Sequence, residues 1–158
     1  MDANLAKTIE DMQKRLQILE DKDALWTLMN RYCTEVDNHH WEAFANTYTE
    51  DGVMEVENWG PKRGRAEIAK AASCEEVFQG VIHSITNLHF EVDGSDTATA
   101  TAYLTLYVTP DVKKPEANYC WGGPYRFEYR RTPEGWRVAK QHLRKFFAIG
   151  EDTEGLFS

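Results

Sequence analysis

The sequence predicts a single α+β domain, residues 1–158, in which three N-terminal helices precede a curved antiparallel sheet. Two observations support this fold class. Apolar residues recur at every third or fourth position through the first forty residues, which contain neither Gly nor Pro. From Val81 onward, segments rich in Thr, Tyr and Val follow one another, separated by turn signals. No internal repeat and no linker divides the chain.

The first helix is predicted to end at His39 and His40. The positions with helical spacing are Leu5, Ile9, Met12, Leu16, Leu19, Ala24, Leu28 and Tyr32. The first part, residues 1–20, resembles a heptad seam and is interpreted as a helical extension. We expect this extension either to contact another chain in an oligomer or to pack on its own domain as a single amphipathic helix.

A short second helix is predicted next, with Tyr48 on its apolar stripe. Glu50-Asp51-Gly52 has the composition of a turn, and a short strand is predicted from Val53 to Trp59. Residues 60–64 are predicted to form a loop and residues 65–78 a third helix.

Four strands complete the predicted sheet. They are residues 81–93, 97–109, 119–131 and 136–149. Asp93-Gly94 is a hairpin signal between the first two of them. Pro133-Glu134-Gly135 turns the chain into the last one.

The composition argues against several partners. A net charge of −8 disfavours binding to nucleic acid or to anionic membranes, because both are negatively charged and bind surfaces rich in Lys and Arg. The polar first ten residues do not resemble a signal peptide, and no apolar run approaches the ~18 residues of a membrane span. Widely spaced cysteines indicate reduced thiols, so we expect a cytoplasmic protein. No metal-ligand spacing and no cofactor motif is present, and we expect neither a metal nor a cofactor.

Asp37 and His83 are the first candidates for catalysis. Asp37 lies near the end of the first predicted helix, and Tyr32 precedes it by five residues, so the two are not neighbours on one helix face. Both can still reach a pocket over the helix end. A neutral histidine in a pocket is a usable base near neutral pH, and a carboxylate on its other nitrogen fixes the tautomer. Each residue also has a structural interpretation, as a solvated Asp at a helix end and a core His bonded to backbone.

The last strand and the aromatic residues supply further candidates. Strict alternation places on one face Trp136, Val138, Lys140, His142, Arg144 and Phe146. Arg144 either neutralises a developing oxyanion or a substrate carboxylate, or lies in solvent at a sheet edge. The aromatic content of 12% indicates pocket walls as well as core. The aromatic candidates are Tyr48, Trp59, Tyr103, Tyr107, Trp121, Tyr125 and Phe146.

Four segments, taken together, resemble a known family. They are Tyr32-Cys-Thr-Glu-Val-Asp37-Asn-His-His-Trp41, Thr47-Tyr-Thr-Glu-Asp-Gly-Val53, His83-Ser-Ile-Thr-Asn87 and Glu134-Gly-Trp-Arg-Val138. They are similar to the end of helix one, the (F/Y)xxDG turn, the HxxxN strand and the GxW closing strand of the NTF2-like superfamily, in its SnoaL-like or scytalone dehydratase-like branch. The resemblance covers nearly the whole chain. It implies a cone fold in which the curved sheet wraps around a pocket.

Within that branch, Asp37 and His83 look like the Asp–His dyad of scytalone dehydratase, hexachlorocyclohexane dehydrochlorinase and bile acid 7α-dehydratase. The resemblance implies that His83 removes a proton and that Asp37 orients it. It also implies that Tyr32 and Arg144 face the substrate, and it adds Asn87 to the substrate contacts. The chain departs from the bile acid enzyme at residues 103–107, which carry no acidic residue where that enzyme has one.

The resemblance therefore implies a cofactor-independent lyase for a hydrophobic, aromatic or polycyclic hydroxylated substrate. The reaction is dehydration or a base-promoted C–C cleavage that releases a small aldehyde. A double-bond isomerase and a non-catalytic small-molecule-binding domain remain alternatives. A homo-oligomer is expected, because such sheets leave one face to be covered, and the dehydratase-like relatives favour a trimer over a dimer.

Overall fold

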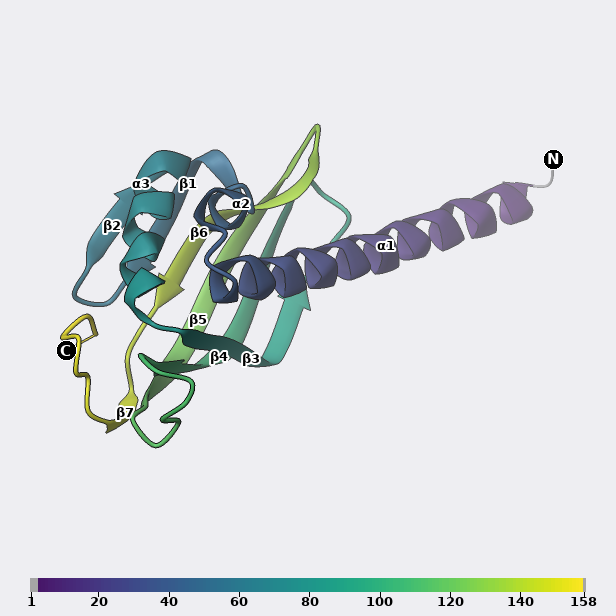
Figure 1. Ribbon diagram of the computed structural model, residues 1–158. Helices are drawn as coiled ribbons and strands as arrows, with labels where there is room; N and C mark the ends of the chain where they lie inside the picture. Colours follow the sequence, from purple (N-terminus) through teal and green to yellow (C-terminus); the bar gives the residue numbers. More distant parts are fainter. Residues whose placement is uncertain (1–2, 158) are drawn as a thin grey trace.

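The computed structural model of the protein describes residues 3–157 and confirms the predicted fold class, with helices followed by a curved, open, mainly antiparallel sheet (Figure 1). Residues 1, 2 and 158, which the predicted domain and its predicted extension include, lie outside the described residues. None of the helices within residues 3–157 combines the length and the apolar character that crossing a membrane requires.

The long helix α1, Ala3–Asp37, has two different halves. Its C-terminal half lies over the sheet, whereas its N-terminal half projects beyond the domain (Figure 1). The spacing in the C-terminal half is that of a helix with one face in a core. The buried apolar residues there are Leu25, Leu28, Met29, Tyr32 and Val36. The short helix α2, Trp41–Ala45, follows after a tight turn at His39, whose φ is 61°.

The sheet contains seven strands. They are β1 (Tyr48–Val56), β2 (Gly60–Arg63), β3 (Gly80–Glu91), β4 (Thr97–Thr109), β5 (Tyr119–Thr132), β6 (Gly135–Leu143) and β7 (Phe147–Gly150). The order is β2-β1-β6-β5-β4-β3, and β7 pairs with β5. The β1–β6 pair is parallel and the other pairs are antiparallel. Helix α3, Gly64–Ala72, lies against β1 and continues into the 3₁₀ turn η1, Ser73–Val77.

The alternation of β4 separates the two faces of the sheet. Its Thr and Tyr side chains face outward, and its inward residues are buried: Ala98, Ala100, Ala102, Leu104, Leu106 and Val108. The inner face is the one that the C-terminal half of α1 covers, so the core lies between helix and sheet. Alanines at one end of β4 leave room for the aromatic core, and leucines line the other end.

Several predicted boundaries are wrong. Tyr48 and Glu50-Asp51-Gly52 belong to β1 rather than to a helix and a turn, and residues 60–63 form β2 rather than a loop. The third helix ends at Ala72. The pairing of β1 with β6 is interrupted between Tyr48 and Val53, which explains why this stretch has the local composition of a turn.

The predicted strand 136–149 is two strands, because β6 ends at Leu143 and β7 begins at Phe147. The connecting residues pass close to Gly123 of β5. A Cβ atom at Gly123 would lie 1.9 Å from the Arg144 carbonyl oxygen, so only glycine permits this passage.

Asp21 fixes the point at which α1 leaves the domain. This residue is 2% exposed, and its carboxylate accepts hydrogen bonds from Arg131 Nη2 at 2.8 Å, Trp136 Nε1 at 3.1 Å and Gln17 Nε2 at 3.1 Å. Burial alone would raise the pKa of Asp21. The hydrogen bonds from Arg131, Trp136 and Gln17 outweigh burial, so the pKa is lowered.

We expect Asp21→Asn to lower the free energy of unfolding by about 2 kcal/mol, because Arg131 and Trp136 lose a charged acceptor. Since the folded pKa is depressed, the contribution is present above the ordinary pKa of 3.8 and is lost as the pH falls through the folded value. Urea denaturation of the unmodified protein and of Asp21→Asn at a series of acidic pH values measures the difference in the free energy of unfolding.

Asp96→Asn is the matched control. Asp96 binds the same Arg131 but its side chain is 82% exposed, so the expected loss is below about 0.5 kcal/mol. Equal losses in the two variants would contradict the role of Asp21.

Candidate functional site

The end of α1 and the edge strand β3 bring Asp37 and His83 together. Asp37 Oδ1 accepts a hydrogen bond from the His83 backbone N–H at 2.9 Å and lies 2.7 Å from His83 Nδ1. An ionised carboxylate only accepts hydrogen bonds, so the ring proton lies on Nδ1 and Nε2 carries the lone pair. The His83 side chain is 8% exposed and lines an internal cavity. The pair therefore presents one basic nitrogen away from the carboxylate.

A third ionisable residue, Glu75 of η1, faces this pair and was not predicted from the sequence. Glu75 Oε1 lies 3.9 Å from His83 Nε2, and its side chain is 7% exposed. Glu75 Oε2 is buried and has no hydrogen-bond partner among residues 3–157. One signal was available: Ile68, Ala72 and Glu75 follow the i, i+4, i+7 spacing of a core-facing helix stripe.

Burial and charge set the protonation of the two facing groups. Burial alone would lower the pKa of His83, but the charges of Glu75 and Asp37 and the hydrogen bond that His83 donates to Asp37 outweigh it, so the pKa is raised. Burial raises the pKa of Glu75, the charge of Asp37 adds to this effect, and His83 opposes it. A carboxyl group and an imidazole, each with a raised pKa, thus face each other across 3.9 Å.

The cavity beside His83 has a volume of about 40 Å³. Five predicted site residues line it: Tyr32, Trp59, His83, Trp121 and Tyr125. Glu75 and Gln141 add polar groups, and the remaining lining is apolar. Among residues 3–157, no group of three or more His, Cys, Asp or Glu side chains is arranged to hold a metal ion.

Three tyrosine hydroxyls form a chain at the base of the cavity. The Tyr32 hydroxyl lies 3.3 Å from that of Tyr125, and the Tyr48 hydroxyl lies 3.4 Å from both Tyr32 and Gln141 Oε1. Burial raises the pKa of all three phenols well above 10.0, so they stay protonated and serve as hydrogen-bond donors. Burial also raises the pKa of the nearby Cys33 to about 12, which disfavours a thiolate nucleophile.

The C-terminal tail packs against two residues that line the cavity, Trp59 and Trp121. Phe157 is 6% exposed, and its ring centroid lies 6.0 Å from that of Trp59 and 5.6 Å from that of Trp121. The Asp152 carboxylate accepts hydrogen bonds from the backbone N–H groups of Leu156 and Phe157 at 3.2 and 2.7 Å. Since Trp59 and Trp121 also line the cavity, the tail holds two of its walls in place.

The other predicted site residues do not line this cavity. Arg144 is exposed, with its Nε 3.9 Å from Glu57 Oε1, and Phe146 is 65% exposed. Tyr107 lies on the outer face of β4, and Asn87 is exposed where the β3–β4 pairing is interrupted. The structure therefore brings together Asp37, His83 and Tyr32, but it does not bring Arg144 to them.

A bulge in β6 explains why His142 and Arg144 lie elsewhere. Glu128 pairs with Lys140 and Tyr129 pairs with Val138, so Ala139 has no partner. One extra residue reverses the alternation of everything that follows. Gln141 and Leu143 consequently face the cavity, in place of the residues that strict alternation predicts.

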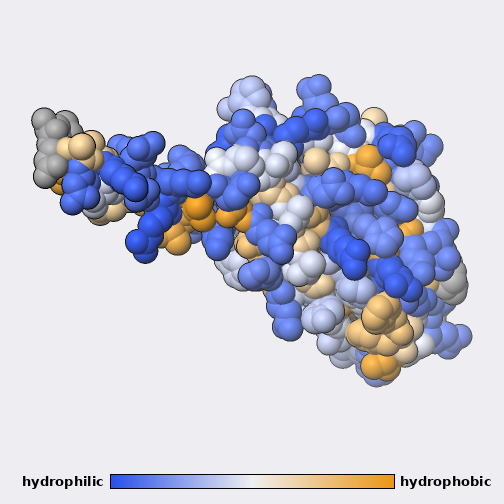
Figure 2. Space-filling model, turned by 180° about the vertical axis from the view of Figure 1, so that it is seen from behind, coloured by the Kyte–Doolittle hydropathy of each residue, from blue (hydrophilic) through white to orange (hydrophobic). Residues whose placement is uncertain are grey.

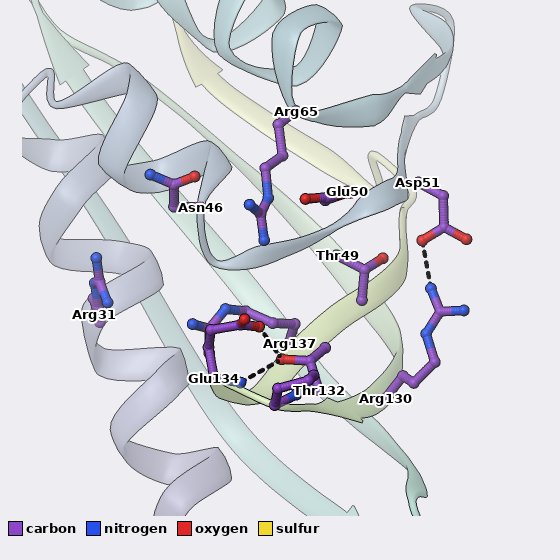
Figure 3. Close-up of a pocket in the computed structure, with 11 residues that line it drawn as sticks. Arg31, Asn46, Thr49, Glu50, Asp51, Arg65, Arg130, Thr132, Glu134 and Arg137 are labelled. Atoms are coloured by element: carbon purple, nitrogen blue, oxygen red, sulfur yellow. Dashed lines mark hydrogen bonds and ion pairs between the residues drawn. The ribbon is translucent and has the colours of Figure 1, made fainter.

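A larger surface hollow, of about 650 Å³, lies between α1, β1 and the β5–β6 turn and shares no residue with the His83 cavity (Figure 3). Burial and the neighbouring Arg65 and Arg31 lower the pKa of Arg137. Arg130 forms an ion pair with Asp51. Glu50 and Glu134 also line the hollow, so its positive charges are largely offset.

We expect NMR titration of the His83 imidazole to give a pKa above the ordinary 6.5, and Asp37→Asn to lower it, because the variant removes a negative charge from the ring. Glu35→Gln is the control, since it removes a carboxylate 2.9 Å from the exposed His40. A His83 pKa that is unchanged in Asp37→Asn would contradict the assigned pairing.

Comparisons with known proteins agree with this architecture. The model of the SnoaL-like domain family matches residues 17–142. An NTF2-like protein with a cystatin-like fold from Novosphingobium aromaticivorans is 25% identical, with 94% of this chain and 96% of that chain covered and a TM-score of 0.74. The search of curated proteins gives no match.

Two further solved structures share the fold at lower identity. LinA is 19% identical, with 89% of this chain and 95% of that chain covered and a TM-score of 0.75. A scytalone dehydratase-like protein from Novosphingobium aromaticivorans is 17% identical, with 87% and 91% covered and a TM-score of 0.76. The extent of the family match shows that this chain belongs to the SnoaL-like domain family, within the NTF2-like superfamily.

Proposed function

We propose that this chain is a lyase in which His83 abstracts a proton from a hydrophobic, hydroxylated substrate and Asp37 orients the imidazole. The observation that carries the proposal is the 2.7 Å contact between Asp37 Oδ1 and His83 Nδ1 beside a cavity. This contact leaves Nε2 free to accept a proton, and the carboxylate stabilises the imidazolium that forms.

Glu75 supplies the complementary acid. In a dehydration, His83 Nε2 first takes the proton from a substrate carbon, which leaves a carbanion. Its electron pair then forms the new double bond, and the hydroxyl leaves with the proton of Glu75 as water. After product release, the proton on Nε2 returns to Glu75 across the 3.9 Å that separates the two groups. The cycle closes with both groups in their starting states.

The cavity favours an apolar substrate with few polar groups. Trp59, Trp121 and apolar side chains form its walls, while Tyr32 and Tyr125 offer neutral donors to a developing oxyanion. Its volume of about 40 Å³ is well below the roughly 300–1,000 Å³ of typical ligand pockets. An aromatic or polycyclic substrate therefore requires the cavity to enlarge, which we propose happens where Trp59 and Trp121 pack on Phe157.

The fold comparisons support an elimination. Two structural relatives are named hexachlorocyclohexane dehydrochlorinases, with 19% and 18% identity and a TM-score of 0.74 for each. The same three ionisable groups also serve base-promoted C–C cleavage. In that reaction His83 takes a hydroxyl proton, the O–H electron pair forms the carbonyl of the departing aldehyde, and the electron pair of the broken C–C bond takes the proton of Glu75. Since every step uses the chain's own side chains, the proposal calls for no cofactor.

We expect His83→Ala to lower the rate of substrate conversion by at least about 10²-fold, because the variant removes the base. Mass spectrometry of a panel of hydroxylated aromatic and polycyclic compounds follows the loss of water or of an aldehyde. An isomerase would leave the substrate mass unchanged.

His142→Ala is the matched control, because this partly exposed histidine lies outside the cavity. It should convert substrate at the rate of the unmodified protein. Full activity in His83→Ala would remove the base assignment, and binding without conversion of any compound would favour a ligand-binding domain.

We expect Glu75→Gln to lower water release by at least about tenfold while exchange of the substrate C–H proton with deuterated solvent continues, because the base remains and the acid is lost. Glu76→Gln, at the exposed neighbouring position, is the control. Equal loss of exchange and release in Glu75→Gln would show that Glu75 acts on His83 and not on the leaving group.

A further inference from the structure

The N-terminal half of α1 carries an apolar stripe that the domain leaves uncovered. Five large side chains there have exposed fractions of 53% (Leu5), 41% (Ile9), 63% (Met12), 55% (Leu16) and 63% (Leu19). This part of the helix projects away from the sheet, and orange apolar patches are visible along it in the space-filling view (Figures 1 and 2). An exposed apolar stripe of this length is costly in water unless another surface covers it.

The spacing of the stripe is that of a coiled coil. Successive members are separated by four, three, four and three residues, which is the a/d pattern of a heptad repeat. The buried half of the same helix follows a different pattern, with Leu25, Leu28 and Met29 close together on one face. The two halves of α1 therefore suit different partners, a helix for the first and a sheet for the second.

The residue types in the seam favour two parallel strands. Ile9 and Leu16 occupy a positions, while Leu5, Met12 and Leu19 occupy d positions. A β-branched residue at a together with leucine at d is typical of parallel dimers. Ile9 and two of the three d residues, Leu5 and Leu19, follow this pattern, and Leu16 and Met12 depart from it. The next a position is Asp23, where two copies would place like charges opposite each other, so the seam ends before it.

The flanking charges fit the same arrangement. In a parallel, in-register pair, each g residue lies beside the e residue five positions later in the other helix. This places Arg15 of each copy beside Glu20 of the other, which gives two such ion pairs in the dimer. The preceding g and e positions hold the uncharged residues Thr8 and Gln13. No like-charged g–e pair occurs within residues 3–20.

The base of the projecting segment is held rigidly. The Asp21 carboxylate is bound to Arg131 and Trp136, two residues after the last seam residue, Leu19. A segment fixed at one end loses less conformational freedom on pairing than a free peptide does. This compensates in part for a seam shorter than three heptads.

We propose that residues 3–20 of α1 pair with the same segment of a second copy of this chain as a short, parallel, two-stranded coiled coil. The seam consists of Leu5, Ile9, Met12, Leu16 and Leu19. Because the pair is parallel, the two domains lie at the same end of the coil, and both His83 cavities lie outside the contact. The arrangement differs from the trimer that the sequence resemblance favours.

Light scattering over a dilution series tests the proposal on the full chain. The unmodified protein should have the mass of a dimer that dissociates on dilution, and Leu16→Glu should raise the dissociation constant at least about 100-fold, because it places carboxylates at the seam. Lys14→Gln changes the charge by the same amount on the outer face and should leave the dimer intact. Circular dichroism should show the same helix content in each variant, since Leu16 and Lys14 are both exposed.

Charge reversal and cross-linking test the parallel register. Arg15→Glu should weaken the dimer roughly tenfold, and adding Glu20→Arg should restore it. A Met12→Cys variant should form a disulfide between copies under mild oxidation. A monomer or trimer in the unmodified protein, a dimer that survives Leu16→Glu, failed rescue by the charge swap, or absence of the disulfide between copies of the Met12→Cys variant would each overturn the proposal.

Discussion

A single carboxylate oxygen connects the long helix, the edge strand and the chemistry of the cavity. Asp37 Oδ1 accepts hydrogen bonds from both the backbone and the ring of His83, so it fixes the position of β3 relative to α1 and the orientation of the imidazole together. The C-terminal end of α1 and the imidazole of His83 therefore cannot move independently. The same contact directs Nε2 toward Glu75, which makes the buried acid and the base parts of one electrostatic unit.

Much of the architecture follows from periodicity. The buried stripe in the C-terminal half of α1 and the alternation of β4 are plain in the sequence, because each of these segments has one face in the core over its whole length. The pairing of Asp37 with His83 has no such local signal, since 46 residues separate them. It was anticipated only because the surrounding motifs resemble a family that places a base and its orienter at these positions.

The parts that could not be predicted share a physical cause. One unpaired residue, Ala139, moves Gln141 to the cavity and His142 and Arg144 away from it, and no local composition marks such a bulge. The inward direction of Glu75 could not be predicted either, because an acidic residue in an acidic turn normally faces water. In both cases contacts between distant segments decide whether a side chain faces the cavity or solvent, and the chemistry of the residue alone favours the other direction.

The contact of Phe157 with Trp59 and Trp121 has a consequence for binding measurements. Under the proposed function, a ligand larger than the cavity must move Trp59 and Trp121, and moving them disturbs their packing on the tail. Part of the binding free energy is then spent on displacing the tail. The hydrogen bonds that Asp152 accepts from the tail would therefore lower the apparent affinity for such a ligand.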